Sequence, residues 1–113
     1  MADQCLFCRI ASGEIPAKIV SESVTCLAFR DVNPQAPVHV LVIPRAHVAS
    51  LNEVASPALL ADVMQMAREV AKHEGIAASG YRVVFNTNAD GGQSVDHLHA
   101  HVIGGRRMAW PPG

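Results

Sequence analysis

The chain has 113 residues, half of them apolar, which suffices for one small domain with a modest hydrophobic core. Its formal net charge of −1 and the lack of a basic stripe argue against a dedicated nucleic-acid binder, and three cysteines, an odd number, argue against a secreted disulfide framework. The sequence has no apolar run of about 18 residues and no basic-then-apolar leader, so we expect a soluble, cytoplasmic protein that does not engage a membrane.

The first half of the chain predicts a short helix and three strands. The helix is closed by Gly13 and Pro16. Two strands joined by a tight turn follow it, and a loop with two prolines leads to a buried, β-branched strand. In chain order these segments are residues 5–16, 17–23, 24–31, 32–37 and 38–44.

The second half predicts one long helix followed by two strands. Ser56 as the cap and Pro57 at the first helical position begin the helix, which runs to about Glu74 and ends at Gly75. Its apolar stripe comprises Leu59, Val63, Met66, Ala67 and Val70. The remaining segments are a strand, a Gly-rich turn and a last strand, at residues 81–86, 87–94 and 96–103. This order indicates an α+β domain, in which the helix covers one face of an antiparallel sheet.

The last predicted strand carries a row of histidines. His97, His99 and His101 alternate with apolar residues, so in a strand they share one face while the apolar residues face the core. A histidine tag would have no such apolar partner face. Because imidazole acts as nucleophile, acid, base or metal ligand near neutral pH, the row predicts a functional site.

The turn before these histidines is rich in small and polar residues. Gly91 and Gly92 allow a ligand to approach the backbone closely, and Gln93 and Ser94 add an amide and a hydroxyl. The turn therefore fits a phosphate cradle as well as an ordinary hairpin connection.

Two other features allow a functional and a structural interpretation. Asp31, at the end of a predicted strand, fits an acceptor for both ribose hydroxyls and equally a turn-capping residue. A set of apolar residues fits either a ligand slot or the core: Phe7, Phe29, Val32 and Leu41.

The pair Cys5 and Cys8 has the C-x-x-C spacing. A redox pair is expected after a strand, and no strand precedes this one. Zinc in proteins usually takes four ligands, so a zinc site here would need two histidines as well. A chance pair of thiols is the third possibility. Cys26 lies in a strand pattern and is interpreted as a small core residue.

The segment "HLHAHVI" resembles the H-φ-H-φ-H-φ-φ signature of the histidine triad (HIT) superfamily, in which φ is apolar. The segments "CLAFRDVNPQAPVHVLVIPRAH" and "WPPG" are similar to the Hint branch, the histidine triad nucleotide-binding proteins, and the resemblance extends from about Cys5 to Gly113. It implies a single HIT domain over residues 1–113 with the signature at 97–103: a five-stranded antiparallel sheet with one long and one short helix, paired as a homodimer. The tail at 106–113 would contact the partner protomer.

The resemblance also implies roles for individual residues. His99 would be the nucleophile that attacks phosphorus, and His101 would bind the phosphate and assist the leaving group. His97 and His39 would complete the imidazole cluster, and Ser94 would hydrogen-bond the phosphate or the leaving amine. The implied nucleotide-binding set is Leu6, Phe7, Ile10, Phe29, Asp31, Val32, Leu41, Asn86, Gly92, Gln93, Ser94, Val95, His99 and His101.

Related proteins hold zinc through a C-x-x-C pair, a histidine of a P-x-x-H stretch and the first triad histidine. The matching residues here are Cys5, Cys8, His47 and His97. The resemblance thus implies a structural zinc that the chemistry itself does not need. One departure from the family is Asp96, which stands where many Hint proteins carry an aromatic residue.

The resemblance implies an enzyme that hydrolyses purine nucleoside phosphoramidates through a nucleotidyl-histidine, releasing AMP and an amine. The alternatives are a dinucleoside polyphosphate hydrolase and a nucleotide-binding regulatory or scaffold protein with minor catalysis. A nucleotidyltransferase is disfavoured, since those enzymes carry glutamine where this chain has His101. The expected partners are purine nucleotides, nucleoside phosphoramidates and a second copy of the chain, without nucleic acid.

Overall fold

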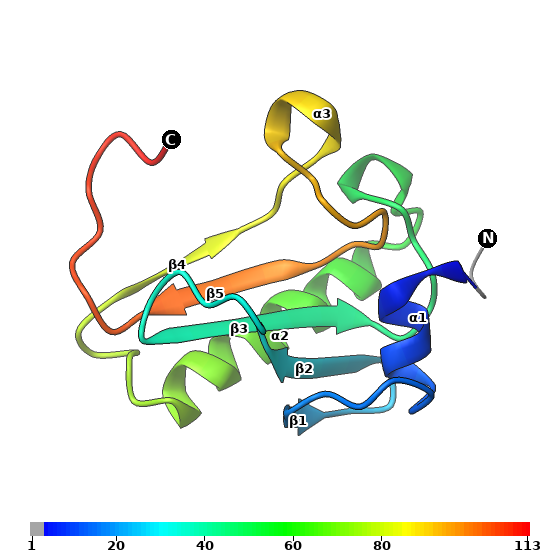
Figure 1. The fold of residues 1–113 in the computed structure, drawn as a ribbon, viewed down its shortest axis with the longest axis horizontal. Helices are drawn as coiled ribbons and strands as arrows, with labels where there is room; N and C mark the ends of the chain where they lie inside the picture. Colours follow the sequence, from blue (N-terminus) through cyan, green and yellow to red (C-terminus); the bar gives the residue numbers. More distant parts are fainter. Residues whose placement is uncertain (1–3) are drawn as a thin grey trace.

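The strands form one antiparallel sheet in the order β1-β2-β3-β5-β4 within residues 4–113, the part of the chain that the computed structural model describes (Figure 1). The strands are Ile19–Glu22 (β1), Cys26–Arg30 (β2), Val38–Pro44 (β3), Tyr81–Val84 (β4) and Ala100–Gly104 (β5). The helices are Leu6–Ala11 (α1), Leu51–Glu53 (η2, a 3₁₀ turn), Pro57–His73 (α2) and Asn88–Gly91 (α3). The predicted α+β class and five-stranded sheet are confirmed, and residues 1–3 of the predicted domain lie outside the described residues.

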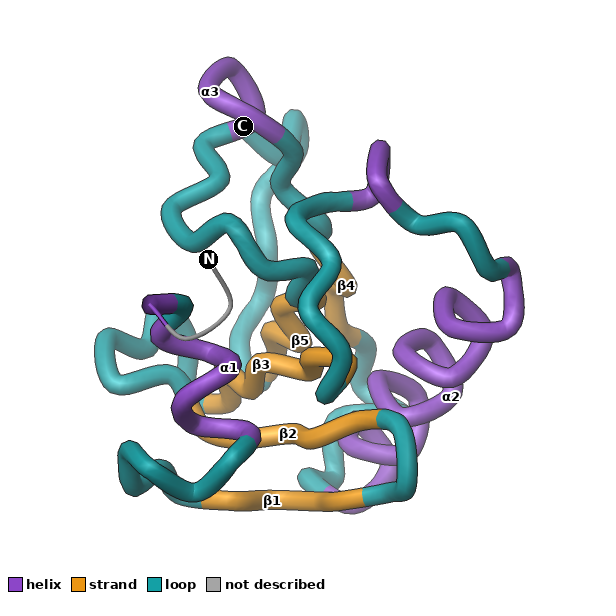
Figure 2. The backbone as a smooth tube through the Cα atoms, turned by 90° about the vertical axis from the view of Figure 1, so that its right-hand side faces the viewer, coloured by secondary structure: helices purple, strands orange, loops and turns teal. Residues whose placement is uncertain are grey.

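The sheet is covered on both faces, by α2 on one side and by the shorter α1 on the other (Figure 2). Alternation along β3 explains this, because Val40 and Val42 belong to the core that α2 covers. The alternate residues Leu41 and Ile43 pack instead with Phe7 of α1. The expectation of a helix on one face was therefore incomplete, since α1 closes a second, smaller core.

Helix α2 begins and ends where its sequence predicts. Pro57 opens the helix, and Gly75 follows it with a left-handed φ of 76°, a conformation that favours glycine. Ser56 occupies the cap position, although its side chain makes no capping hydrogen bond. Within the predicted stripe Leu59 is half-buried, and the buried members are Val63, Met66, Ala67 and Val70. Among residues 4–113, no helix has the length and apolarity needed to cross a bilayer.

The strand predicted for residues 96–103 is shorter than expected. Strand β5 begins only at Ala100, which pairs with Val42 of β3. His97 and His99 precede the strand because other bonds replace the ladder there: the His97 ring donates to the Pro44 carbonyl at 2.8 Å. The next amide, that of Leu98, donates to the carbonyl of Val48 at 2.7 Å. The row of histidines therefore begins in a loop and ends in a strand.

Two other predicted segments also need correction. The strand predicted for 81–86 ends at Val84. The Gly-rich turn predicted for 87–94 contains the single-turn helix α3, which ends at Gly92 with a left-handed φ of 77°. The fold thus has more short helical segments than the one short helix expected.

Candidate functional site

Four imidazoles lie on the α1 side of the sheet, where β3, β5 and the loop before β5 meet. The ring centroids of His99 and His101 are 4.9 Å apart, and those of His39 and His101 are 5.2 Å apart. Phe7 of α1 presents its ring to His99 in an edge arrangement with centroids 5.1 Å apart. His39, His97 and His99 are buried. The structure thus brings together three of the four histidines that the sequence singled out for the cluster, and the ring of the fourth, His97, contacts His47 instead.

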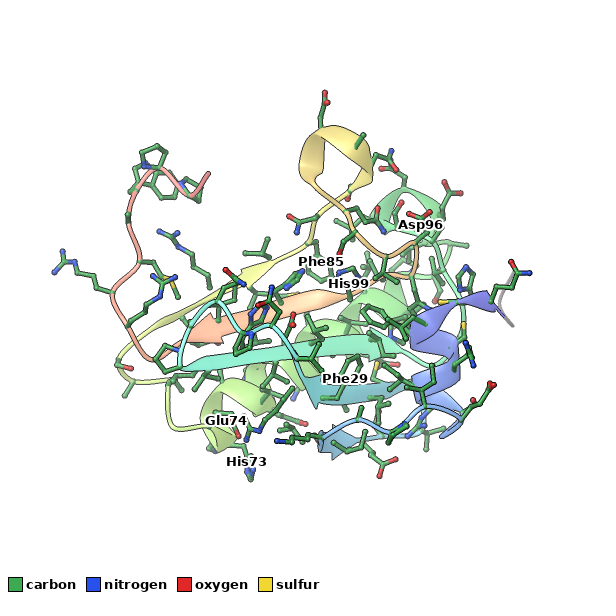
Figure 3. All side chains as sticks on the ribbon, in the orientation of Figure 1. Phe29, His73, Glu74, Phe85, Asp96 and His99 are labelled. Atoms are coloured by element: carbon green, nitrogen blue, oxygen red, sulfur yellow. The ribbon has the colours of Figure 1, made fainter. Side chains whose placement is uncertain are left out.

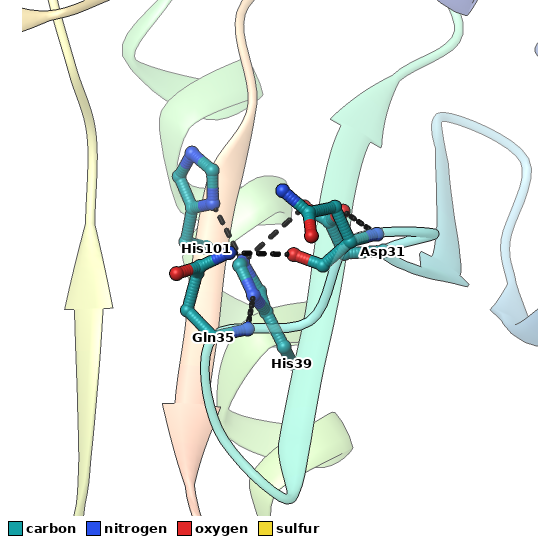
Figure 4. A network of polar contacts seen from close by, with 5 residues as sticks. Asp31, Gln35, His39 and His101 are labelled. Atoms are coloured by element: carbon teal, nitrogen blue, oxygen red, sulfur yellow. Dashed lines mark hydrogen bonds and ion pairs between the residues drawn. The ribbon is translucent and has the colours of Figure 1, made fainter.

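Backbone contacts determine which nitrogen of His39 carries the proton. The amide of Gln35 donates to His39 Nδ1 at 3.0 Å, so this nitrogen is an acceptor and the neutral ring carries its proton on Nε2 (Figure 4). That Nε2 lies 2.9 Å from His101 Nδ1 and 3.4 Å from Asp31 Oδ2. His39 therefore donates to His101, which must carry its own proton on Nε2. Burial lowers the pKa of His39, which keeps the ring neutral, and the Asp31 carboxylate only partly opposes this.

The Nε2 atom of His101 is buried and has no hydrogen-bond partner among the described residues. Burial, together with the neighbouring rings of His99 and His39, lowers the pKa of His101 to about 4. An unpaired buried N–H is costly, so this atom is suited to donate to an acceptor on a bound ligand.

His99 has the opposite arrangement of donor and acceptor. Its Nδ1 lies 2.7 Å from the carbonyl oxygen of His97, to which it donates. The lone pair of the neutral ring is therefore on Nε2. A buried imidazole with its tautomer fixed in this way is suited to act as a nucleophile through Nε2.

His99 and His101 line a cavity of about 320 Å³ beneath α1, which we call the imidazole cavity. Predicted nucleotide-binding residues in its wall are Leu6, Phe7, Ile10, Phe29, Asp31, Val32, Leu41, Ser94, Val95, His99 and His101. The sequence prediction missed four further lining residues: Ile15, Pro16, Ala17 and Arg30. The first three form an apolar run between α1 and β1, a signal that could have placed them here. Val32 lies at the cavity edge with its side chain fully exposed.

Three predicted nucleotide-binding residues do not line the imidazole cavity: Asn86, Gly92 and Gln93. The side-chain amide of Gln93 donates to the carbonyls of Ala49 and Val95, at 2.7 and 3.0 Å, and its oxygen accepts from the amide of Asn88. The backbone amides of Gly92 and Gln93 are bonded within the turn as well. Gln93 thus fixes the loop that carries Ser94, and direct phosphate contact by these residues stays a prediction.

The turn-capping interpretation of Asp31 is confirmed, and its role as a ribose acceptor stays a prediction. Its Oδ1 accepts from the amide of Asn33 at 2.8 Å, which caps the turn after β2. Its Oδ2 faces His39, and the residue lines the imidazole cavity. A second cavity, of about 670 Å³, also adjoins Asp31 and is lined by Lys18, Pro34, Pro37 and His39 among others.

A separate cluster joins the N-terminal segment to the loop before β5. Cys5 Sγ and Cys8 Sγ lie 3.3 and 3.4 Å from His97 Nδ1, and Cys8 Sγ lies 3.3 Å from His47 Nδ1. Because the Nε2 of His97 donates to the Pro44 carbonyl, the lone pair of Nδ1 faces the two thiols. The cluster therefore presents two sulfur and two nitrogen donors to one point.

These donors fit a tetrahedral zinc ion. Zinc bonds of about 2.3 Å to sulfur and about 2.0 Å to nitrogen place the two ligand atoms about 3.5 Å apart, close to the separations found here. Burial raises the pKa of the Cys8 thiol to about 11, and its hydrogen bond and charge interaction with Cys5 raise it in the same direction. A metal ion would displace that proton and relieve the crowding of the two thiols. Two thiols and two imidazoles are a donor set that zinc prefers.

Comparison with known proteins identifies the family. The family model described as the HIT domain matches residues 12–108. The chain belongs to the HIT family. This confirms the superfamily that the histidine row suggested, and the match covers most of the chain.

Relatives of this HIT protein match it along nearly its whole length. An uncharacterised HIT-like protein of Synechococcus elongatus is 50% identical over 115 residues, which span all of both chains. The crystal structure of a HIT family hydrolase from Legionella pneumophila is 53% identical with a TM-score of 0.94, covering 97% of this chain and 100% of that one. A histidine triad nucleotide-binding protein from Candida albicans is 31% identical with a TM-score of 0.84, covering 96% of this chain and 83% of that one.

Three further residues of this HIT protein, Cys26, His73 and Asp96, lie outside the imidazole cavity. Cys26 is fully buried in the core under α2, as expected. His73 is exposed in the last turn of α2. Asp96 is exposed in the loop before β5, and it forms no ion pair with an imidazole in the described part of the chain (Figure 3). The homodimer and the partner contact of residues 106–113 stay predictions.

Proposed function

We propose that this HIT protein is a hydrolase that cleaves purine nucleoside phosphoramidates to a nucleoside monophosphate, such as AMP, and an amine. One observation carries the proposal: the lone pair of His99 Nε2 and the unpaired Nε2–H of His101 belong to adjacent rings in the wall of one cavity. A nucleophile and a proton donor beside the same cavity suit a displacement at phosphorus. The similar protein from Legionella pneumophila is named a hydrolase, and that from Candida albicans is named nucleotide-binding.

In the first step, His99 Nε2 attacks phosphorus and the phosphorus–nitrogen bond breaks. The leaving amine takes the Nε2 proton from the imidazolium form of His101. In that form Nδ1 is protonated as well, so the Nε2–H of His39 turns from His101 to Asp31 Oδ2, 3.4 Å away. The negative charge of a bound phosphate stabilises the imidazolium by raising the pKa of that ring above its value of about 4 in this structure. In the second step, the oxygen of water bonds to phosphorus, the His99–phosphorus bond breaks and His101 takes the proton of the water. His101 is thereby restored, and the two steps together consume one water molecule.

The remaining residues bind and orient the nucleotide. Asp31, in the cavity wall, accepts hydrogen bonds from the ribose, and the apolar wall around Phe7 and Phe29 holds the purine. His39 fixes the tautomer of His101, and the carbonyl of His97 fixes that of His99. The Ser94 hydroxyl in the cavity wall hydrogen-bonds the phosphate or the departing nitrogen.

A zinc ion held by Cys5, Cys8, His47 and His97 would be structural, because protein ligands fill all four positions. It would tie the start of α1 to the loop that carries the nucleophile. The active form would be a cytoplasmic homodimer in which residues 106–113 of each chain contact the partner. The exposed Trp110 in that tail, at 82% of its full exposure, supports the dimer.

The test is a comparison of substrates at matched concentration. We expect an adenosine phosphoramidate to be hydrolysed with a much higher kcat/KM than a diadenosine polyphosphate. A preference for the polyphosphate would replace the proposal with the alternative hydrolase. Nucleotide binding without turnover of either substrate would instead favour a regulatory or scaffold role.

A further inference from the structure

The imidazole cavity has a neighbour that shares one of its walls. A cavity of about 390 Å³, which we call the Asp96 cavity, is lined by Gln4, Cys5, Leu6, His47, Ser94, Val95 and Asp96. Leu6, Ser94 and Val95 line the imidazole cavity as well. The two cavities are therefore neighbours on either side of the wall that contains Ser94.

The two carboxylates near the site line different cavities. Asp31 lines the imidazole cavity and not the Asp96 cavity, whereas Asp96 lines only the latter. In the view of Figure 3, His99 is labelled between Phe29, which marks the apolar wall, and Asp96. A nucleoside held by Asp31 and Phe29 occupies the imidazole cavity. The leaving group, which is the other substituent of its phosphorus, would then extend toward Asp96.

The Asp96 cavity has an unbalanced charge. The carboxylate of Asp96 makes no hydrogen bond or ion pair within residues 4–113, and neither lysine nor arginine lines the cavity. A zinc ion on the neighbouring cluster would not supply a net positive charge, since two thiolates cancel its charge of about +2. The negative charge of Asp96 is therefore available to a ligand.

We propose that the Asp96 cavity is the leaving-group subsite and that Asp96 selects leaving amines that carry a second, positively charged group. The inference rests on the proposed function and names the substrate class within it. An ammonium or guanidinium group on the leaving arm pairs with Asp96 once the phosphorus is held beside His99. An anionic arm, including the second phosphate of a dinucleoside polyphosphate, is repelled by the same carboxylate. One residue thus favours amine substrates and disfavours polyphosphates.

The expected size of the preference follows from the exposure of Asp96. Exposed ion pairs contribute about 0.2–1 kcal/mol, which corresponds to a factor of at most about five in kcat/KM. Salt screens such a pair, so the preference should shrink as ionic strength rises. Repulsion of an anionic arm lowers kcat/KM for that substrate as well. The ratio of kcat/KM between substrates with cationic and anionic arms is therefore the most sensitive measure of the preference.

The experiment uses three adenosine phosphoramidates whose leaving amines have arms of equal length, ending in an ammonium, a neutral amide or a carboxylate. Values of kcat/KM are measured for the wild type, for Asp96→Asn and for the matched control Asp90→Asn. Asp90 is an exposed carboxylate on α3 that lines neither cavity. We expect the ammonium-to-carboxylate ratio to fall at least threefold in Asp96→Asn and to stay at the wild-type value in Asp90→Asn. Equal ratios in all three proteins would overturn the inference.

Equilibrium binding separates this inference from the proposed function. The dissociation constants of the same three compounds are measured with His99→Ala, in which the covalent step is blocked, and with His99→Ala carrying Asp96→Asn. Tighter binding of the ammonium compound that depends on Asp96 supports the subsite even if the wild type turns over none of the compounds. Turnover of all three with no charge preference in rate or binding would overturn the subsite and leave the hydrolase intact. Failure of all three to bind would overturn both.

Discussion

His39 Nε2 lies 2.9 Å from His101 Nδ1, and this contact joins the proton donor of the proposed reaction to the backbone of the loop before β3. The amide of Gln35 fixes one nitrogen of His39, and His39 in turn fixes one nitrogen of His101. The result is an Nε2–H on His101 that belongs to the wall of the imidazole cavity. The chemistry of His101 therefore depends on a residue that touches no substrate atom in the proposed reaction.

Replacement of His39 should lower kcat more than it raises KM. In His39→Phe, the donor to His101 Nδ1 is lost, so His101 no longer favours the tautomer that carries a proton on Nε2. We expect kcat on an adenosine phosphoramidate to fall on the order of tenfold or more, because proton transfer contributes about 100-fold or more to such reactions. His39→Gln, which keeps a side-chain donor, should recover part of the loss. A change confined to KM would mean that His39 only shapes the binding site.

The metal cluster should hold about one zinc ion per chain. The double variant Cys5→Ser, Cys8→Ser should lose the metal and unfold at a lower temperature, since α1 is then no longer tied to His47 and His97. The matched control is Cys26→Ala, because Cys26 lies in the other core. Metal analysis of protein never exposed to a chelator and thermal unfolding check this. A wild type without zinc, or zinc retained by the double variant, would refute the assignment.

Stability should decline as the solution becomes acidic. Burial lowers the pKa of His101 from 6.5 to about 4, so in this range the unfolded chain binds a proton that the folded chain does not. The contribution of neutral His101 is complete above pH about 6.5 and is lost as the pH falls toward about 4. Denaturant unfolding at pH 7 and pH 5 measures the difference. His101→Asn should show a shallower decline, and an equal slope in the two proteins would show that His101 titrates normally.

The homodimer prediction concerns the C-terminal tail. Trp110 is exposed in the isolated chain, where Arg82 lies 6.0 Å from its ring centre and donates a hydrogen bond to the carbonyl of Ala109. Arg82 thus orients the tail, and the exposed ring of Trp110 is available to contact a partner protomer. We expect light scattering to give the mass of a dimer at micromolar concentration, and truncation before Met108 to alter substrate preference. A monomer at that concentration would contradict the prediction.

The strand pattern of the sheet could be predicted because it depends on local alternation. Val40 and Val42 alternate with Leu41 and Ile43, and both faces proved to be covered, which a run of consecutive apolar residues indicates. The start of β5 could not be predicted from alternation. It is determined by the bond between the His97 ring and the carbonyl of Pro44, residues that are 53 positions apart in the chain.

The identities of the site residues were more predictable than their protonation. The histidine row and the C-x-x-C pair are visible in the sequence, and the structure brings each set together. The tautomers depend on backbone groups, the amide of Gln35 and the carbonyl of His97, which carry no signal in the side-chain pattern. The sequence correctly placed the Gly-rich turn next to the site, but it did not show which residue of the turn faces the cavity. Gln93 hydrogen-bonds within the loop, and Ser94 lines the cavity wall.

The covalent role of His99 is tested most directly by trapping the intermediate. Wild-type protein and His99→Ala are mixed with an adenosine phosphoramidate, quenched in acid-free denaturant within one turnover and digested for mass spectrometry. We expect the wild-type peptide that contains His99 to gain the mass of one adenylyl group, and the variant to show neither that gain nor amine release while still binding AMP. Amine release by His99→Ala near the wild-type rate, or an adenylyl group on a different residue, would contradict the account.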